Sequence, residues 1–172
     1  MELVLYPDPI LRKRASPQEV VDEEVREQAT KMFEIMYREN GVGLAAPQVG
    51  WSTRLFVMNP QGADQPEGEQ VFVNPRILDA TGEELDEEGC LSMPEVRGEV
   101  LRNTWVQVEA QALSGETFQQ ELRDLPARVF QHEYDHLDGI LFISRLSETE
   151  KLTVKKALKR LEKEYRQKVA RR

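Results

Sequence analysis

The first clear pattern in the chain is an apolar stripe with helical spacing. It consists of Val25, Ala29, Met32, Phe33, Met36 and Tyr37. Residues at these intervals share one face of an α-helix, which predicts a helix that packs on a core. The helix is expected to begin near Asp22 and to stop at Asn40-Gly41.

The middle of the chain is rich in β-branched and aromatic residues that alternate with polar ones, which predicts strands. The expected strands cover residues 54–58, 71–74, 96–101, 104–113 and 117–122, and residues 77–85 form another strand pair or a bend. Ser114-Gly115 supplies a hairpin turn between the last two strands. A mostly antiparallel β region between helices is therefore expected, which is an α+β arrangement.

The last third of the chain predicts two more helices. Asp124 is a suitable N-cap, and a helix is expected from there to about Asp138, where Gly139 ends it. The apolar run at 140–143 predicts a short buried strand. Residues 147–150 then form a capping box that opens a final helix. The expected apolar stripe of that helix consists of Leu152, Leu158, Leu161 and Tyr165.

Composition indicates one globular domain over residues 1–172, because 40% of the residues are hydrophobic and 31% are charged. The chain has no apolar run of about 18 residues, so a membrane span is not expected. The N-terminus lacks the basic and apolar regions of a signal peptide. Cys90 is the only cysteine, which excludes an intrachain disulfide and fits a reducing compartment. A cytoplasmic protein is therefore expected.

Charge is distributed unevenly along the chain. Residues 151–172 hold ten lysines and arginines against two glutamates, a net charge of +8, so residues 1–150 must carry −16 for the total to be −8. The acidic body argues against a protein that binds DNA or other nucleic acid over its whole surface. The basic C-terminal helix or tail is the segment that would meet an anionic partner.

The strongest chemical signal is the sequence HEYDH at residues 132–136, an H-E-x-x-H pattern that contains both histidines of the chain. His132 and His136 lie four residues apart, so on a helix they direct two imidazoles toward the same place. Glu133 can reach a water at that place, and the arrangement suits a metal ion that activates water for hydrolysis. Asp135 is predicted to be an exposed helix residue or, alternatively, an acceptor for a histidine N–H.

Hydrolytic metal sites of this kind usually take three protein ligands and leave one position for water. No histidine follows the motif, and Glu162 and Glu164 lie in a lysine-rich segment that looks solvated. Cys90 alone would be read as a small buried residue. Beside two histidines that lack a third ligand, it becomes the favoured thiolate ligand. A Cys-His-His set is compatible with Zn²⁺ or Fe²⁺, and ligand softness does not choose between them.

Residues 41–48 read GVGLAAPQ, a small apolar segment punctuated by glycines. The segment lacks the spacing and the lysine of a phosphate-binding loop. Two interpretations remain open. It is either a buried loop where two backbones approach closely, or a loop that lines a substrate and directs Gln48 toward it.

Three segments together resemble the signature motifs of bacterial peptide deformylases: GVGLAAPQ at 41–48, EGCLS at 88–92 and QHEYDHL at 131–137. Their order and intervals also match, and YPDPILR at 6–12 is similar to the start of that family. The resemblance implies an α+β fold in which antiparallel sheets pack around a central H-E-x-x-H helix, with an N-terminal and a C-terminal helix. It implies a hydrolase that removes the formyl group from the N-terminal formyl-methionine of newly synthesised polypeptides and releases formate.

The resemblance also implies roles for individual residues. Cys90, His132 and His136 would bind one divalent metal ion, which is Fe²⁺ in many native members and Zn²⁺ or Ni²⁺ in many purified ones. Glu133 would act as the general base. The backbone N–H of Leu91 and the side-chain amide of Gln48 would stabilise the oxyanion. The C-terminal helix would dock on the ribosome, although a merely solvated helix fits the sequence as well.

Specificity for methionine requires an apolar pocket. By position, the residues expected to line it are Val42, Gly43, Leu125 and Val129, with plain core packing as the alternative. Arg97 is expected either to contact the peptide backbone of the substrate or to be an ordinary surface arginine.

Two other functions compete with this interpretation. A small H-E-x-x-H endopeptidase would use Glu162 or Glu164 as its third ligand and would not need Cys90. A non-enzymatic protein with a structural metal would usually need four protein ligands, and the chain offers only three strong ones. Replacing Cys90 with serine distinguishes the endopeptidase from a deformylase, because loss of metal would favour the deformylase.

Overall fold

The structure is a computed structural model, and it describes residues 1–170. Its helices are α1 (Glu23–Arg38), α2 (Asp124–Leu137) and α3 (Glu148–Val169). Its strands are β1 (Gly43–Ala45), β2 (Leu55–Met58), β3 (Gln70–Thr81), β4 (Glu84–Cys90), β5 (Met93–Arg102), β6 (Trp105–Gln111) and β7 (Thr117–Arg123). Short 3-10 helices lie at Pro9–Arg12, Ala46–Val49, Pro66–Gly68 and Phe142–Ser144.

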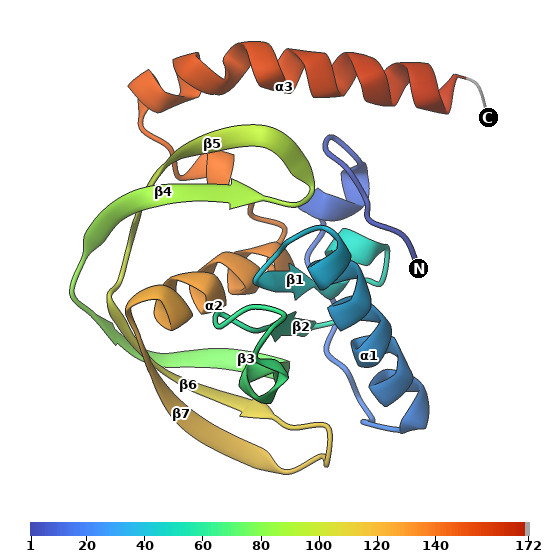
Figure 1. Cartoon of the computed structure of the whole chain (residues 1–172), viewed down its shortest axis with the longest axis vertical. Helices are drawn as coiled ribbons and strands as arrows, with labels where there is room; N and C mark the ends of the chain where they lie inside the picture. The colour runs from blue at the N-terminus through green and yellow to red at the C-terminus, as the bar shows by residue number, and fades with distance from the viewer. Residues whose placement is uncertain (171–172) are drawn as a thin grey trace.

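The strands form two antiparallel sheets. Five strands pair in the order β1-β2-β3-β6-β7, and β4 pairs with β5 in a separate ribbon. Between β3 and β4 the chain turns at Gly82, which has a positive φ of 67°. Figure 1 shows α2 in the middle of the molecule, between the β4–β5 ribbon and the β6–β7 end of the larger sheet. The predicted α+β fold around the H-E-x-x-H helix is therefore confirmed.

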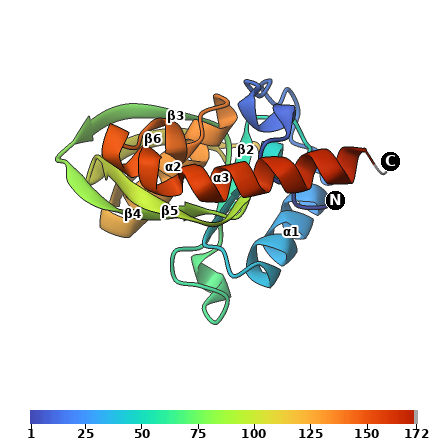
Figure 2. The ribbon, with the colours of Figure 1, turned by 90° about the horizontal axis from the view of Figure 1, so that it is seen from above.

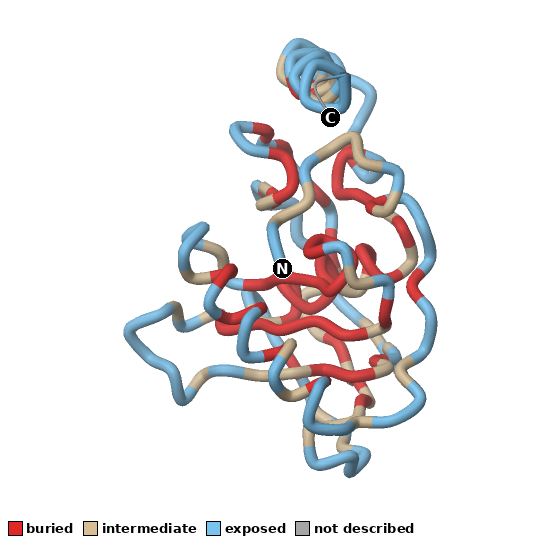
Figure 3. Tube along the Cα trace, turned by 90° about the vertical axis from the view of Figure 1, so that its right-hand side faces the viewer, coloured by how far each residue is buried: buried red, intermediate tan, exposed pale blue. Residues whose placement is uncertain are grey.

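Strand β2 is buried on both faces and joins two of the three hydrophobic clusters of the core. Leu55 and Val57 belong to the cluster under α1, whereas Phe56 and Met58 belong to the cluster under α2. Alternate residues of a strand point to opposite faces, so four consecutive apolar residues serve two clusters. The tube in Figure 3 shows such buried segments gathered in the interior of the molecule. The α2 helix is therefore held by packing from its neighbours.

Helix α1 matches its prediction closely. The Asp22 side chain accepts a hydrogen bond from the N–H of Val25 and caps the helix. At the other end, Asn40 has a positive φ of 57°. The predicted stripe is buried except for Tyr37, which is partly buried against the same cluster.

Helix α3 lies on the outside of the molecule, along β5 (Figures 1 and 2). Its buried residues are Val154 and Leu161. The prediction that Leu152 belongs to the buried stripe was wrong, because this residue is 70% exposed. Val154 takes its place, since it precedes the partly buried Leu158 by four residues and Leu161 by seven. Within residues 1–170, no helix is long and apolar enough to cross a membrane.

Two local predictions in the last third were wrong. Residues 140–143 do not form a strand: Leu141 and Phe142 are buried, but the chain bends into the 3-10 helix Phe142–Ser144. A short apolar run indicates burial without distinguishing strand from helix. Asp124 is the first residue of α2 and not its N-cap. Its N–H bonds to the carbonyl of Thr104, so the strand pairing continues up to the helix.

Candidate metal centre

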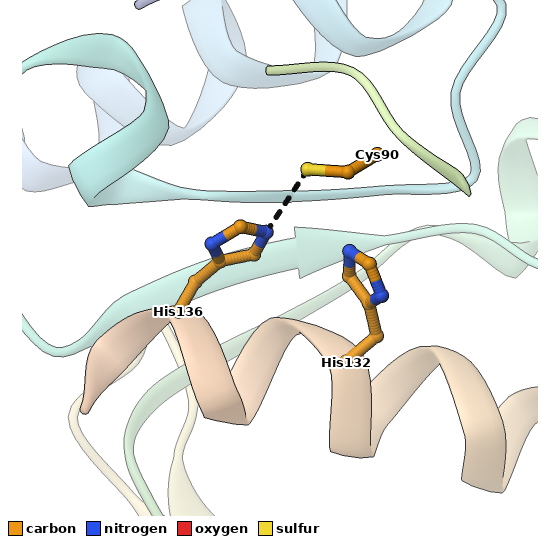
Figure 4. Close-up of side chains that lie close together, drawn as sticks. All are labelled: Cys90, His132 and His136. Atoms are coloured by element: carbon orange, nitrogen blue, oxygen red, sulfur yellow. Dashed lines mark hydrogen bonds between the residues drawn. The ribbon is translucent and has the colours of Figure 1, made fainter. Parts of the chain in front are cut away.

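His132 and His136 lie one turn apart on the face of α2 that points toward the end of β4. Figure 4 shows both rings rising from the helix toward Cys90. The His136 Nε2 and Cys90 Sγ atoms are 3.3 Å apart, and the centroids of the two imidazoles are 5.0 Å apart. One ligand atom from each residue lies within 4.8 Å of the others, and all three residues are buried. No other cluster of three Cys, His, Asp or Glu residues within residues 1–170 converges in this way.

The local structure of β4 explains how Cys90 reaches the histidines. Glu88 and Cys90, two residues apart, both lie on the buried side of the strand. A register shift between Gly89 and Cys90 interrupts the pairing with β5 at this point. A Cβ at residue 89 would meet the guanidinium of Arg97, so the glycine lets this side chain lie close to the backbone. The EGC sequence therefore directs an acid and a thiol inward while Arg97 passes over the backbone between them.

The converging side chains fit a divalent metal ion. A thiolate and two imidazoles are suitable ligands for Zn²⁺ and Fe²⁺. Three protein ligands also leave a coordination position for water or substrate, as hydrolytic sites require. Beside them, Oε2 of Glu133 is buried without a hydrogen-bond partner among residues 1–170. An unpaired buried acceptor at this place fits a site that holds a polar reactant.

Glu133 has the surroundings expected of a proton-transfer group. It packs against Gly43, where an added Cβ would clash with the Glu133 carboxylate. Burial raises the pKa of Glu133 to about 7, although the nearby His132 acts in the opposite direction. A carboxyl group whose pKa lies near neutrality can both accept a proton and return it.

The Gln48 side chain is fixed in one orientation. Its Oε1 accepts a hydrogen bond of 2.8 Å from the N–H of Ala45. Its Nε2 therefore faces the metal centre, 3.4 Å from the Cys90 Sγ and 3.2 Å from the Ser92 Oγ. Leu91 lies between Cys90 and Ser92 in the sequence, and it lines the pocket that opens in front of the metal centre. The amide of Gln48 is thus a prepositioned donor at the edge of the site.

Buried charged groups contact His132 through its Nδ1 atom. The Nδ1 of His132 lies 2.9 Å from Oε2 of Glu88. Arg102 donates to both oxygens of Glu88, at 2.8 and 3.0 Å, and also to Asp135 at 2.6 Å. Burial raises the pKa of Glu88, but hydrogen bonds from Arg102 and His132 outweigh it and hold the pKa far below its usual range. An ionised Glu88 orients the ring so that Nε2 is directed at the metal position.

Glu88, Arg102 and Arg128 belong to this buried group, but no role was predicted for them from the sequence. Arg128 donates to Glu88 at 3.0 Å and lies one turn before the first histidine on α2. The available signal for Glu88 was its position two residues before Cys90 on a strand. Arg102 gave no local signal, because its role depends on the pairing of β5 with β4.

The interpretation of Asp135 as an exposed residue was wrong. Asp135 is 4% exposed, and its carboxylate accepts hydrogen bonds from Arg102 and Arg145. The alternative, a bond to a histidine N–H, is also not found: Glu88 takes that role for His132. The Nδ1 of His136 has no partner within the described residues.

A pocket of about 440 Å³ opens in front of Cys90, His132 and Glu133. The residues predicted from the sequence to contact substrate all line it, namely Val42, Gly43, Arg97, Leu125 and Val129. Val42 and Leu125 are 38% and 50% exposed, whereas Val129 is buried. The pocket therefore has an apolar inner wall next to the metal centre and exposed apolar side chains elsewhere along its lining.

Glu162 and Glu164 lie on α3, away from the histidines. Glu162 accepts a hydrogen bond of 3.1 Å from Tyr6, and Glu164 lies 3.7 Å from Arg160. Neither belongs to the converging cluster of ligand atoms. The third ligand that an endopeptidase reading requires is therefore not placed at the site.

An α+β fold that sets a buried Cys-His-His cluster beside the glutamate of an H-E-x-x-H helix defines a metal-dependent hydrolase. The sequence model of the polypeptide deformylase family matches residues 1–152. This chain belongs to that family. Its activity is hydrolytic removal of the N-terminal formyl group from nascent polypeptides.

Individual relatives agree with this membership. A peptide deformylase of Acidobacterium capsulatum is 43% identical, over 94% of this chain and 95% of the relative. Peptide deformylase 1B, chloroplastic/mitochondrial, of Arabidopsis thaliana is 41% identical, over 98% of this chain but 62% of the relative. The crystal structure of Plasmodium falciparum peptide deformylase has a TM-score of 0.94 at 37% identity and covers 96% of this chain and 97% of that one. Arabidopsis thaliana peptide deformylase 1B in complex with an inhibitor has a TM-score of 0.91 at 41% identity, over 99% and 94% of the two chains.

Proposed function

We propose that deformylation by this chain depends on one divalent metal ion held by Cys90, His132 and His136, with Glu133 transferring protons. The observation that carries the proposal is the convergence of three buried ligand atoms within 4.8 Å of one another, beside the unpaired Glu133 oxygen. We infer Fe²⁺ as the native ion, with Zn²⁺ or Ni²⁺ as substitutes. A thiolate with two imidazoles accommodates all three, and the likeness to bacterial deformylases favours iron.

The chemistry divides between the ion and the protein. When bound, such an ion polarises carbonyl oxygens and lowers the pKa of water toward about 7. Glu133 accepts the proton of the attacking water at Oε2, the carboxylate oxygen without a partner in residues 1–170. As the bond between the formyl carbon and nitrogen breaks, the same oxygen returns a proton to the leaving amine. The products are formate and a free α-amino group.

Gln48 and Leu91 are the proposed donors to the formyl oxygen as negative charge develops on it. The Gln48 amide is already turned toward the site by its bond to Ala45, so little reorganisation is needed during the reaction. The N–H of Leu91 follows directly after Cys90 in the wall of the pocket. Donors that are prepositioned in this way stabilise a transition state more than a ground state.

The apolar part of the pocket is proposed to take the methionine side chain. Val129 lies one turn before His132 on α2 and faces the pocket, which Val42 and Gly43 also line. Apolar residues at this place suit an apolar side chain next to the reacting group. Arg97 lines the same pocket and is proposed to contact the peptide backbone of the substrate.

We propose that residues 1–172 act as one catalytic domain in the cytoplasm, whose basic C-terminal helix docks on the ribosome. The described part of α3 buries one face against β5, while Lys155, Lys156, Lys159 and Lys163 are exposed. Exposed cations of this kind suit the phosphates of ribosomal RNA. The final Arg171 and Arg172 lie outside the described residues. Salt-sensitive cosedimentation with ribosomes, lost when these four lysines become glutamates, is the expected result, and unchanged cosedimentation would contradict docking.

Release of formate from a formyl-Met tripeptide tests the central proposal. The protein is purified without oxygen, its metal content is measured, and a Cys90→Ser variant is treated in parallel. Wild type should contain iron and release formate, and the variant should lose both metal and activity. A metal-loaded wild type that releases no formate, or a variant that keeps its metal, would overturn the proposed ligand set and reaction.

A further inference from the structure

We propose that Arg145 is a positioning residue for the metal centre, acting on His132 through buried charged groups. Arg145 follows the 3-10 helix Phe142–Ser144, and 42% of its side chain is exposed. It lines a second pocket of about 300 Å³ together with Tyr134 and Asp135, none of which lines the pocket in front of the metal centre. Arg145 therefore does not belong to the pocket in front of the metal centre.

The connection from Arg145 to His132 is continuous. Arg145 donates from Nε and Nη2 to Oδ2 and Oδ1 of Asp135, at 2.5 and 2.6 Å. Arg102 donates from Nη1 to the same carboxylate at 2.6 Å and holds both oxygens of Glu88 with Nε and Nη2. Oε2 of Glu88 lies 2.9 Å from Nδ1 of His132. Charged groups take part in every link, which strengthens hydrogen bonds and fixes their direction.

Asp135 depends on Arg145 for most of its pairing. Arg102 reaches only Oδ2, and within residues 1–170 the Oδ1 atom is paired by Arg145 alone. A buried carboxylate that loses these donors must draw on Arg102 or on water. Arg102 already donates to both oxygens of Glu88, so a movement of its guanidinium toward Asp135 draws it away from Glu88. Loss of Arg145 should therefore loosen the Arg102–Glu88 bond and, with it, the orientation of the His132 ring.

Arg145 is also the member of this hydrogen-bonded series that lies between Asp135 and solvent. The second pocket is lined by Arg102, Asp135 and Arg145, so truncation of the exposed arginine opens a path for water to the buried carboxylate. A lysine at this position keeps the positive charge but cannot hold both oxygens with a planar fork. The geometry of the fork, and not the charge alone, is what the position requires.

The test compares Arg145→Ala and Arg145→Lys with wild type in forms loaded with Zn²⁺ or Co²⁺. The expected result for Arg145→Ala is about tenfold faster release of Zn²⁺ to a chelator, a shift in the visible absorption of the Co²⁺ form, and a lower kcat at unchanged KM. Arg145→Lys should fall between alanine and wild type, and it carries the test if the alanine variant does not fold. The matched control is Arg26→Ala on α1, because Arg26 has a similar side-chain exposure of 40% and pairs with Glu23. This control should release metal at the wild-type rate.

A double-mutant cycle with Glu88→Gln tests whether Arg145 affects metal release through the hydrogen bonds that end at Glu88. Because Glu88→Gln breaks the chain before His132, Arg145→Ala should then accelerate metal release by much less than tenfold. Wild-type release from Arg145→Ala, or an equal effect in both backgrounds, would overturn the inference. The inference rests on the proposed ligand set, which His132→Ala checks separately. Tight metal binding by His132→Ala would refute that ligand set, whereas metal loss there with normal release from Arg145→Ala would refute only the positioning role.

Discussion

The two sides of helix α2 differ in how completely their buried carboxylates are paired. On the pocket side, Glu133 has an oxygen without a hydrogen-bond partner among residues 1–170. On the opposite side, both oxygens of Asp135 are paired, by Arg102 and Arg145. Each of the two acids is 4% exposed, so access to solvent does not explain the difference.

This difference separates a supporting group from a reacting one. A buried carboxylate with a full set of donors is held in a single orientation and can orient its neighbours. A buried carboxylate that lacks donors keeps a lone pair available for a proton, and burial brings the pKa of Glu133 to about 7. Two acids only two residues apart on one helix thus serve different purposes because their surroundings differ.

Removal of the reacting carboxylate should have the largest effect. Glu133→Ala should lower kcat for formate release by about 10⁴ while metal content stays at the wild-type level, because the base is lost and the ligands remain. Steady-state kinetics with a formyl-Met tripeptide and metal analysis of the same sample measure both. Full activity in this variant would show that the unpaired oxygen of Glu133 is not the proton acceptor.

A change beside the metal centre should have a smaller but still large effect. Gln48→Ala should lower kcat by about 10²–10³ with little change in KM, since the amide is proposed to act on charge that develops in the transition state. The variant should still bind metal. A rise in KM at unchanged kcat would instead indicate that Gln48 binds the substrate in its ground state.

Changes among the residues that orient His132 should alter metal affinity more than the rate of the chemical step. Glu88→Gln weakens the acceptor at Nδ1 of His132 and should lower metal affinity by about 10–100-fold. Activity should return when excess metal is added, which distinguishes this variant from Glu133→Ala. Competition with a chelator gives the affinity. Unchanged affinity would mean that Glu88 does not orient the ligand.

A change in the wall of the pocket should leave both sides of α2 intact and have the smallest effect. Val129→Phe fills space where the methionine side chain is proposed to bind, so KM for formyl-Met peptides should rise by about tenfold. The metal content and the response to Glu133→Ala should be unchanged. Leu78→Phe, at an exposed position on β3, is a suitable control, and equal KM values in both variants would remove Val129 from the substrate pocket.

Much of the fold followed from local patterns. The stripe of α1, the strands at 54–58 and 71–74 and the turn at Ser114-Gly115 all occur where the sequence predicts them. These features depend on interactions within a few residues, such as helical periodicity and turn conformation. The prediction of a strand at 140–143 was wrong because a short apolar run reports burial and leaves the backbone geometry open.

The site also divides into features that local sequence predicts and features that depend on the folded chain. By itself the sequence determined which side chains were available as ligands, because the chain contains two histidines four residues apart and a single cysteine. Only the tertiary structure decided that Glu88, Arg102, Asp135 and Arg145 form one buried group behind His132. Charged residues read as surface residues in a sequence, since burial of a charge costs free energy unless partners are present. Those partners come from β4, β5, α2 and the segment after the 3-10 helix Phe142–Ser144, and they meet only when the chain is folded.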